Sequence, residues 1–153
     1  MNRFHRSVFN VALRMLGNVQ DAEDVTQTVF GNAFAGLDSY DPKYRFFSWI
    51  YRMTVNESLN TQNSRRNVVS FDAGFDVAAP SAMSQSAAEA EERVGRALLE
   101  LKPDDRAVVV LKHFVSFSYE EISDVLGVPV KTVKSRLFTA RERLRESLVA
   151  AGA

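Results

Sequence analysis

The chain has 153 residues, 46% of them hydrophobic, and it carries 19 basic and 19 acidic residues. The hydrophobic content excludes wholesale disorder, and the absence of cysteine excludes a disulfide scaffold and any thiolate metal site while suiting a reducing cytoplasm. The two histidines, His5 and His113, lie far apart in sequence, so we expect no metal site, no cofactor and no catalytic triad.

The amino-terminal segment is predicted to form a helix. Its apolar residues recur at helical spacing from Val8 to Leu16, and Gly17 interrupts the pattern. The first twenty residues contain three arginines and no acid, so a mitochondrial transit peptide is an alternative interpretation. No apolar stretch in the chain is long enough for a secretory signal or a membrane span.

A second helix is predicted to begin at Asp21, a good N-cap residue, and to continue with apolar positions as far as Leu37. The opposite side of this helix carries Asp24, Gln27 and Thr28. By composition alone, such a polar side simply faces water.

Aromatic residues crowd the next segment. Six of the sixteen aromatic residues in the chain lie within residues 40–51, interleaved with basic side chains. They are Tyr40, Tyr44, Phe46, Phe47, Trp49 and Tyr51. One interpretation is a packed core, and the other is a surface for single-stranded bases, which stack on aromatic rings with about 1–3 kcal/mol per base.

The middle of the chain is acidic. Residues 67–92 contain no basic residue and five acids, whereas residues 1–66 have 8 basic and 6 acidic residues and residues 93–153 have 11 and 8. Residues 67–92 also lack a sustained hydrophobic period. We therefore predict a linker whose last residues enter a helix.

The carboxy-terminal part has the pattern of a helix-turn-helix. Ser118 and Glu121 form a capping box, so a short helix should begin at Tyr119. Gly127 is suited to the left-handed residue that ends it, and Pro129 to the first turn of a second helix. The turn between the helices is then about three residues long.

A helical wheel of the second helix separates two faces. The side expected to pack on the core carries Val133, Leu137, Ala140, Leu144 and Leu148. Another face carries Lys131, Lys134, Ser135, Phe138, Arg141 and Arg145. This second face is either an ordinary solvated basic face or the base-reading face of a recognition helix, with cations on phosphates and Phe138 on a thymine methyl.

Three segments together carry a family resemblance. They read DAEDVTQTVF (21–30), FFSWIYRMTVN (46–56) and SYEEISDVLGVPVKTVKSRLFTARERL (118–144). In this order, they make the chain resemble the extracytoplasmic-function (ECF) subfamily of bacterial sigma-70 sigma factors. The resemblance implies an all-α fold with two small helical domains, a sigma region 2 domain (1–66) and a sigma region 4 helix-turn-helix domain (93–153), joined by a flexible acidic linker (67–92).

The resemblance also implies a function. Proteins of this subfamily are not enzymes; they bind core RNA polymerase through its clamp helices and flap and direct initiation in the cytoplasm at promoters with minus-10 and minus-35 elements. An anti-sigma factor is an expected partner, alongside polymerase and promoter DNA.

The resemblance assigns roles to residues by position. Polymerase docking falls on Asp24, Gln27 and Thr28, although Thr28 stands where an acid is common and Gly31 where a large apolar residue is common. Contacts with the minus-10 element fall on Tyr40, Asp41, Lys43, Tyr44, Arg45, Trp49, Arg52, Asn56, Asn60, Arg65 and Arg66. Contacts with the minus-35 element fall on Lys131, Thr132, Lys134, Ser135, Arg136, Phe138, Arg141 and Arg145.

Two other functions fit parts of the sequence. One is a helix-turn-helix repressor or activator whose amino-terminal half senses a signal or forms a dimer. The other is a helical decoy that keeps the docking helix but uses no promoter.

Overall fold

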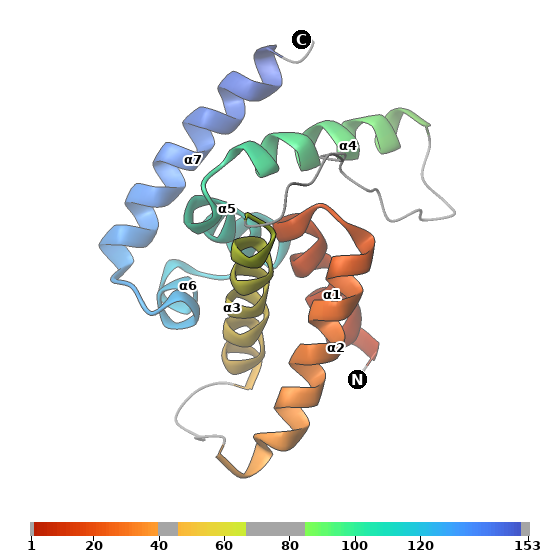
Figure 1. Ribbon diagram of the computed structural model, residues 1–153. Helices are drawn as coiled ribbons and strands as arrows, with labels where there is room; N and C mark the ends of the chain where they lie inside the picture. Colours follow the sequence, from red (N-terminus) through yellow and green to blue (C-terminus); the bar gives the residue numbers. More distant parts are fainter. Residues whose placement is uncertain (1, 40–45, 67–84, 151–153) are drawn as a thin grey trace.

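The computed structural model describes residues 2–39, 46–66 and 85–150, and every regular element in these ranges is helical (Figure 1). The N-terminal bundle consists of α1 (Asn2–Leu16), α2 (Val19–Ala35), the short turn η1 (Leu37–Ser39) and α3 (Phe46–Arg66). The C-terminal bundle consists of α4 (Gln85–Glu100), α5 (Pro103–Val109), the π-helical turn η2 (Val110–Phe114), α6 (Tyr119–Leu126) and α7 (Val130–Ala150). The predicted all-α class is confirmed.

The start of α2 differs from the prediction. The helix begins at Val19, and the N-cap is Asn18, whose side-chain oxygen accepts a hydrogen bond of 3.0 Å from the backbone N–H of Asp21. Asp21 is therefore in the first turn rather than at the cap. The reason is that Gly17, at a φ of +70°, turns the chain directly into the new helix after α1 ends.

The end of α2 also differs. This helix stops at Ala35, and Leu37 lies in η1 with half of its side chain exposed. The apolar period had placed Leu37 on the buried side of a longer helix. Because η1 winds more tightly than an α-helix, it does not continue that face.

The C-terminal bundle begins inside the predicted linker, since α4 starts at Gln85. Residues 67–84 lie outside the described residues. Helix α4 lies across α5 and α7, and α5 passes directly into η2 (Figure 1). Pro103 occupies the first turn of α5, where its missing N–H costs no hydrogen bond.

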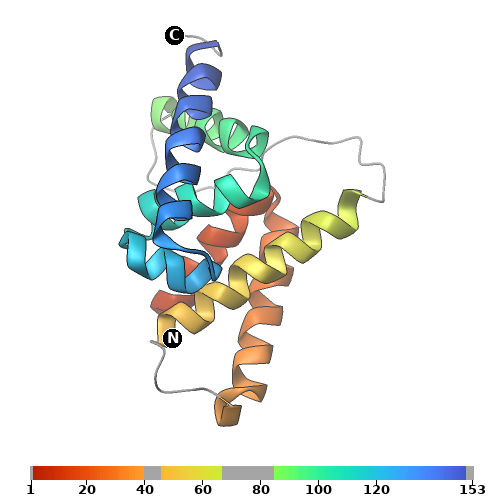
Figure 2. The same ribbon diagram turned by 90° about the vertical axis from the view of Figure 1, so that its left-hand side faces the viewer.

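The two bundles pack against each other around one continuous hydrophobic core. Helix α3 contacts α6, and α1 contacts α4 (Figure 2). The ring of Phe117, just before α6, lies 5.5 Å from the ring of Phe47 and 5.2 Å from that of Tyr51. Both of these α3 residues were in the aromatic segment, so part of that segment forms core, as one interpretation held.

Helix α7 uses its predicted apolar stripe over most of its length. Val133, Leu137 and Ala140 are buried, and Leu144 packs against the core. Leu148 is exposed, however, contrary to the prediction. The last turns of α7 project beyond α4 in both views, so the stripe there has no helix to cover it (Figures 1 and 2).

Candidate functional site

The helix-turn-helix forms as its local sequence predicts. The Ser118 side chain accepts from the backbone N–H of Glu121 (3.1 Å), and the Glu121 carboxylate accepts from the backbone N–H of Ser118 (2.9 Å). Helix α6 begins at Tyr119 and ends before Gly127, which has a φ of +68°. Three residues then separate α6 from α7, which fixes α7 against α6 as the second helix of the motif.

The outward face of α7 presents an aromatic ring among cations. Phe138 is 69% exposed, although a ring of this size gains free energy from burial. The other residues predicted on this face are also exposed, namely Lys131, Lys134, Ser135, Arg141 and Arg145. Thr132 and Arg136 are half-buried, so they lie at the border of this face. The structure thus keeps the predicted base-reading set together on one accessible surface.

The cations on this face differ in how they are held. Lys134 Nζ lies 5.5 Å from the centre of the Tyr119 ring, and Lys112 Nζ lies 4.6 Å from the same ring. Arg145 is paired with the carboxylate of Glu142, one turn before it, at 2.9 Å. Lys134 therefore lies beside a neutral ring, whereas the charge of Arg145 is partly neutralised by Glu142.

Arg141 is held by a neutral partner. Its Nε and Nη2 lie 3.3 and 3.2 Å from Nε2 of His113, which lies in η2. Partial desolvation of the ring and the positive charges of Arg141 and Lys112 together lower the pKa of His113 below its usual value. The imidazole is therefore neutral at physiological pH and accepts the two N–H groups.

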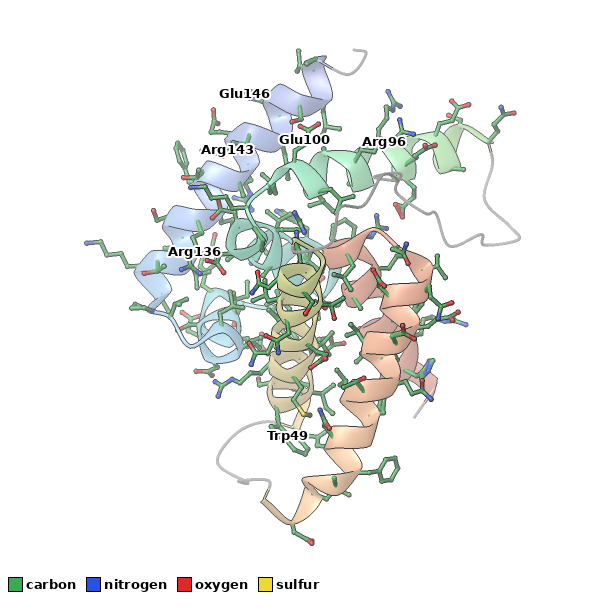
Figure 3. All side chains as sticks on the ribbon, in the orientation of Figure 1. Trp49, Arg96, Glu100, Arg136, Arg143 and Glu146 are labelled. Carbon is green, nitrogen blue, oxygen red and sulfur yellow. The ribbon has the colours of Figure 1, made fainter. Side chains whose placement is uncertain are left out.

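A second stripe runs along α3. Trp49, Arg52, Asn56 and Asn60 follow one another at three- and four-residue spacing, which places them on one side of the helix. Asn56 and Asn60 are exposed, and Trp49 and Arg52 are half-buried. Trp49 lies near the end of α3 that points away from α4 (Figure 3), with its ring 5.8 Å from that of Phe46.

The side chains of the other residues predicted to contact the minus-10 element are not among those that the structure describes. Tyr40, Asp41, Lys43, Tyr44 and Arg45 lie outside the described residues, between η1 and α3. Two further predicted residues, Arg65 and Arg66, belong to the last turn of α3, but the description does not include their side chains.

Arg52 joins this stripe to the helix-turn-helix. Its Nε donates a hydrogen bond of 3.2 Å to the carbonyl of Val125, and its Nη2 donates to the carbonyl of Asp124. Both carbonyls are in the last turn of α6, where a helix has no backbone donors left to offer them. In this structure, the guanidinium of Arg52 is thus engaged with α6.

The outward side of α2 carries the predicted docking residues. Asp24, Gln27 and Thr28 are all exposed. Further along α2 and η1, the side chains of Phe34 and Leu37 are 63% and 50% exposed. The sequence analysis did not single out Phe34, and it expected Leu37 to be buried, because a period alone does not tell which end of a stripe is covered. Both apolar side chains are thus accessible beyond the predicted docking residues.

The structure shows one central residue that the sequence analysis missed. Arg106 is 1% exposed and lies where the two bundles meet. Its five N–H groups make five hydrogen bonds of 2.6 to 3.1 Å, with the carbonyls of Met15, Leu98, Leu99 and Leu101 and the side chain of Gln62. The only sequence signal is an arginine that directly precedes an apolar run.

Two kinds of site are absent from the residues that the structure describes. Within residues 2–39, 46–66 and 85–150, no group of three or more His, Cys, Asp or Glu side chains is placed to hold a metal ion. None of the helices in these ranges combines the length and the apolar character that a membrane span needs.

Comparisons with known proteins match two regions of the chain. A family model for sigma-70 region 2 matches residues 1–68, and one for sigma-70 region 4 matches residues 91–144. The ECF RNA polymerase sigma factor SigW of Bacillus subtilis is 30% identical to the chain over 154 residues, which cover 92% of this chain and 82% of SigW.

Two solved structures have a similar fold. One is the sigma factor RpoE in complex with the anti-sigma factor NepR from Bartonella quintana, with a TM-score of 0.80 and 24% identity over 97% of this chain and 93% of that one. The other is CnrH in complex with the cytosolic domain of CnrY, with a TM-score of 0.75 and 26% identity over 99% and 86% of the two chains.

Proposed function

Since this chain belongs to the ECF subfamily of the sigma-70 sigma factors, we propose that it binds core RNA polymerase through α2 and reads a promoter through α3 and α7. Sigma factors direct initiation and are not enzymes. The observation that carries the proposal is the exposed face of α7, where Phe138 stands among cations on the second helix of a helix-turn-helix. An aromatic side chain in that position is suited to DNA contact and poorly suited to a core.

The minus-35 element would meet the outward face of α7. Lys134, Ser135 and Phe138 lie near the start of the helix, where recognition helices reach base edges. A lysine suits purine acceptors, and an aromatic ring suits a thymine methyl. Lys131, Arg141 and Arg145, together with the half-buried Thr132 and Arg136, would contact the sugar-phosphate backbone and set the register.

The minus-10 element would meet the stripe on α3. Asn56 and Asn60 offer exposed amides, Trp49 offers a ring near the end of the helix, and Arg52 offers a cation. By the family assignment, the minus-10 contacts would also include Arg65, Arg66 and five residues outside the described ones, namely Tyr40, Asp41, Lys43, Tyr44 and Arg45. Capturing an unstacked base costs a few kcal/mol, and stacking and amide contacts offset part of that cost without nucleotide hydrolysis.

Use of Arg52 at the promoter has a structural consequence. Its hydrogen bonds with Val125 and Asp124 occupy the guanidinium, and α3 packs against α6. A phosphate that binds the guanidinium of Arg52 must replace these hydrogen bonds. We therefore expect α3 and α6 to move apart when the protein binds polymerase and both promoter elements.

Polymerase docking is assigned to Asp24, Gln27 and Thr28 on the exposed side of α2. The neighbouring exposed Phe34 and Leu37 would add apolar contact area to this surface. As partners besides polymerase and promoter DNA, we propose an anti-sigma factor, since the similar RpoE structure contains one. Because core polymerase and the chromosome are in the bacterial cytoplasm, we also propose the cytoplasm as the compartment of this protein.

The proposed function is tested by run-off transcription with purified core polymerase on a promoter library. Transcripts that depend on this chain and share two conserved elements are the expected result. The control is core polymerase alone on the same library. DNA binding without transcripts would instead indicate a repressor, and polymerase binding without transcripts would indicate a decoy.

A further inference from the structure

His113 and Arg141 form a pair that the family assignment does not explain. They are 28 residues apart, His113 in η2 and Arg141 in α7, and both are exposed. Helix α5 widens into the π-helical turn η2 just before this residue, and such turns often occur at functional sites. The pair lies at the edge of the face of α7 that carries Lys134 and Phe138.

The chemistry of the pair is determined by its donors. An arginine side chain has five N–H donors and no acceptor, so Nε2 of His113 must be the acceptor and the ring proton must lie on Nδ1. The two contacts, at 3.3 and 3.2 Å, use one edge of the guanidinium, formed by Nε and Nη2. The opposite edge, formed by Nη1 and the second N–H of Nη2, is left for a bidentate anion.

We propose that His113 is a positioning residue that orients Arg141 toward a phosphate of the minus-35 DNA. This inference rests on the proposed function, because it assumes that α7 lies on a promoter. An exposed arginine loses rotamer freedom when it binds. The two hydrogen bonds to the imidazole on η2 restrict Arg141 before DNA arrives and thereby reduce this entropic cost.

The neighbouring arginine shows why a neutral partner matters. Arg145 is held by the carboxylate of Glu142, which competes with a phosphate for the same cation. His113 orients Arg141 without cancelling its charge. The lowered pKa of His113, caused by partial desolvation and by the cations Arg141 and Lys112, is consistent with an imidazole that stays neutral. A phosphate contact of Arg145 therefore competes with Glu142, whereas that of Arg141 does not compete with a carboxylate.

The test uses holoenzyme assembled from core polymerase and the full chain, with a fluorescent duplex of the strongest promoter recovered by run-off transcription. Affinity is measured over a range of salt concentrations for wild type, His113→Ala, His113→Gln, Arg141→Ala and the double variant His113→Ala/Arg141→Ala. Thermal unfolding of each variant reports on folding separately. Gln is the matched control, because its side-chain oxygen is also a neutral acceptor.

We expect Arg141→Ala to reduce the slope of log affinity against log salt by about 0.9, the value for one lost phosphate contact. His113→Ala should weaken binding by about 2- to 10-fold, the effect of one net hydrogen bond, and should reduce the slope in the same direction. His113→Gln should stay close to wild type. The double variant should bind like Arg141→Ala alone.

Several results would overturn the inference. They are an unchanged affinity and salt slope in His113→Ala, a His113→Gln holoenzyme as weak as His113→Ala, or a full additional loss when His113→Ala is added to Arg141→Ala. Failure of the wild-type chain to support any promoter binding by polymerase would instead overturn the proposed function and the inference with it.

Discussion

Replacement of Arg106 by methionine should strongly destabilise the protein. The guanidinium is buried, and it spends all five N–H groups on carbonyls of α1 and of the end of α4 and on the Gln62 side chain. Methionine fills a similar volume with apolar atoms, so the change removes the donors and leaves little cavity. The buried acceptors then lose their partners.

The magnitude follows from the acceptors left behind. The Leu98 carbonyl also accepts from the backbone N–H of Leu101 and stays satisfied. The carbonyl of Leu99 lies in the last turn of α4, and that of Leu101 directly follows the helix, so the helix offers neither of them a further backbone N–H. At about 1–3 kcal/mol for each of these two unsatisfied carbonyls, we expect the free energy of unfolding to fall by about 2–6 kcal/mol.

The assay is urea unfolding followed by far-ultraviolet circular dichroism, with Gln62→Ala as the matched control. That control removes one acceptor and leaves Arg106 Nη1 bonded to the Met15 carbonyl at 2.6 Å, so its expected loss is about 1 kcal/mol. If Arg106→Met does not fold, Gln62→Ala still tests the network. A stability of Arg106→Met within 1 kcal/mol of wild type would refute the reasoning.

Four further changes have defined outcomes. Phe138→Ala should reduce discrimination between promoters altered at the minus-35 element by about 1–3 kcal/mol while polymerase binding is kept; an unchanged ratio of run-off transcripts would contradict its base-reading role. Alanine at both Asp24 and Gln27 should lower co-purification with core polymerase without a change in melting temperature, and an unchanged yield would remove them from the docking surface. Gly31→Ala should raise the free energy of unfolding by about 1 kcal/mol, because the added Cβ meets nothing within 4 Å; a lower melting temperature would speak against this. Ser118→Ala should lower the free energy of unfolding by about 1 kcal/mol through loss of the cap of α6, as denaturant unfolding would measure.

Features with a local cause could be predicted from the sequence. The capping box of Ser118 and Glu121, the left-handed Gly127 and the three-residue turn depend on residues within a few positions of one another. Where two local signals competed, the prediction was less reliable. Asn18 and Asp21 are both good N-cap residues three positions apart, and the turn at Gly17 decided in favour of Asn18.

The ends of apolar stripes could not be predicted in the same way. Leu37 and Leu148 both continue a helical period, yet both are exposed. A period shows which side of a helix is apolar, but a residue on that side is buried only where a neighbouring element covers that part of the helix. This depends on how far α2 continues and on where α4 crosses α7.

The sequence by itself determined that the chain is helical, that it contains a helix-turn-helix, and which side chains of α7 share its exposed basic face. Only the tertiary structure decided what those side chains are bound to. Arg52 reaches carbonyls 72 and 73 residues away, Arg106 reaches Met15 across 91 residues, and Arg141 reaches His113 across 28. Periodicity and capping act over one or two helical turns, whereas such contacts depend on how whole helices pack.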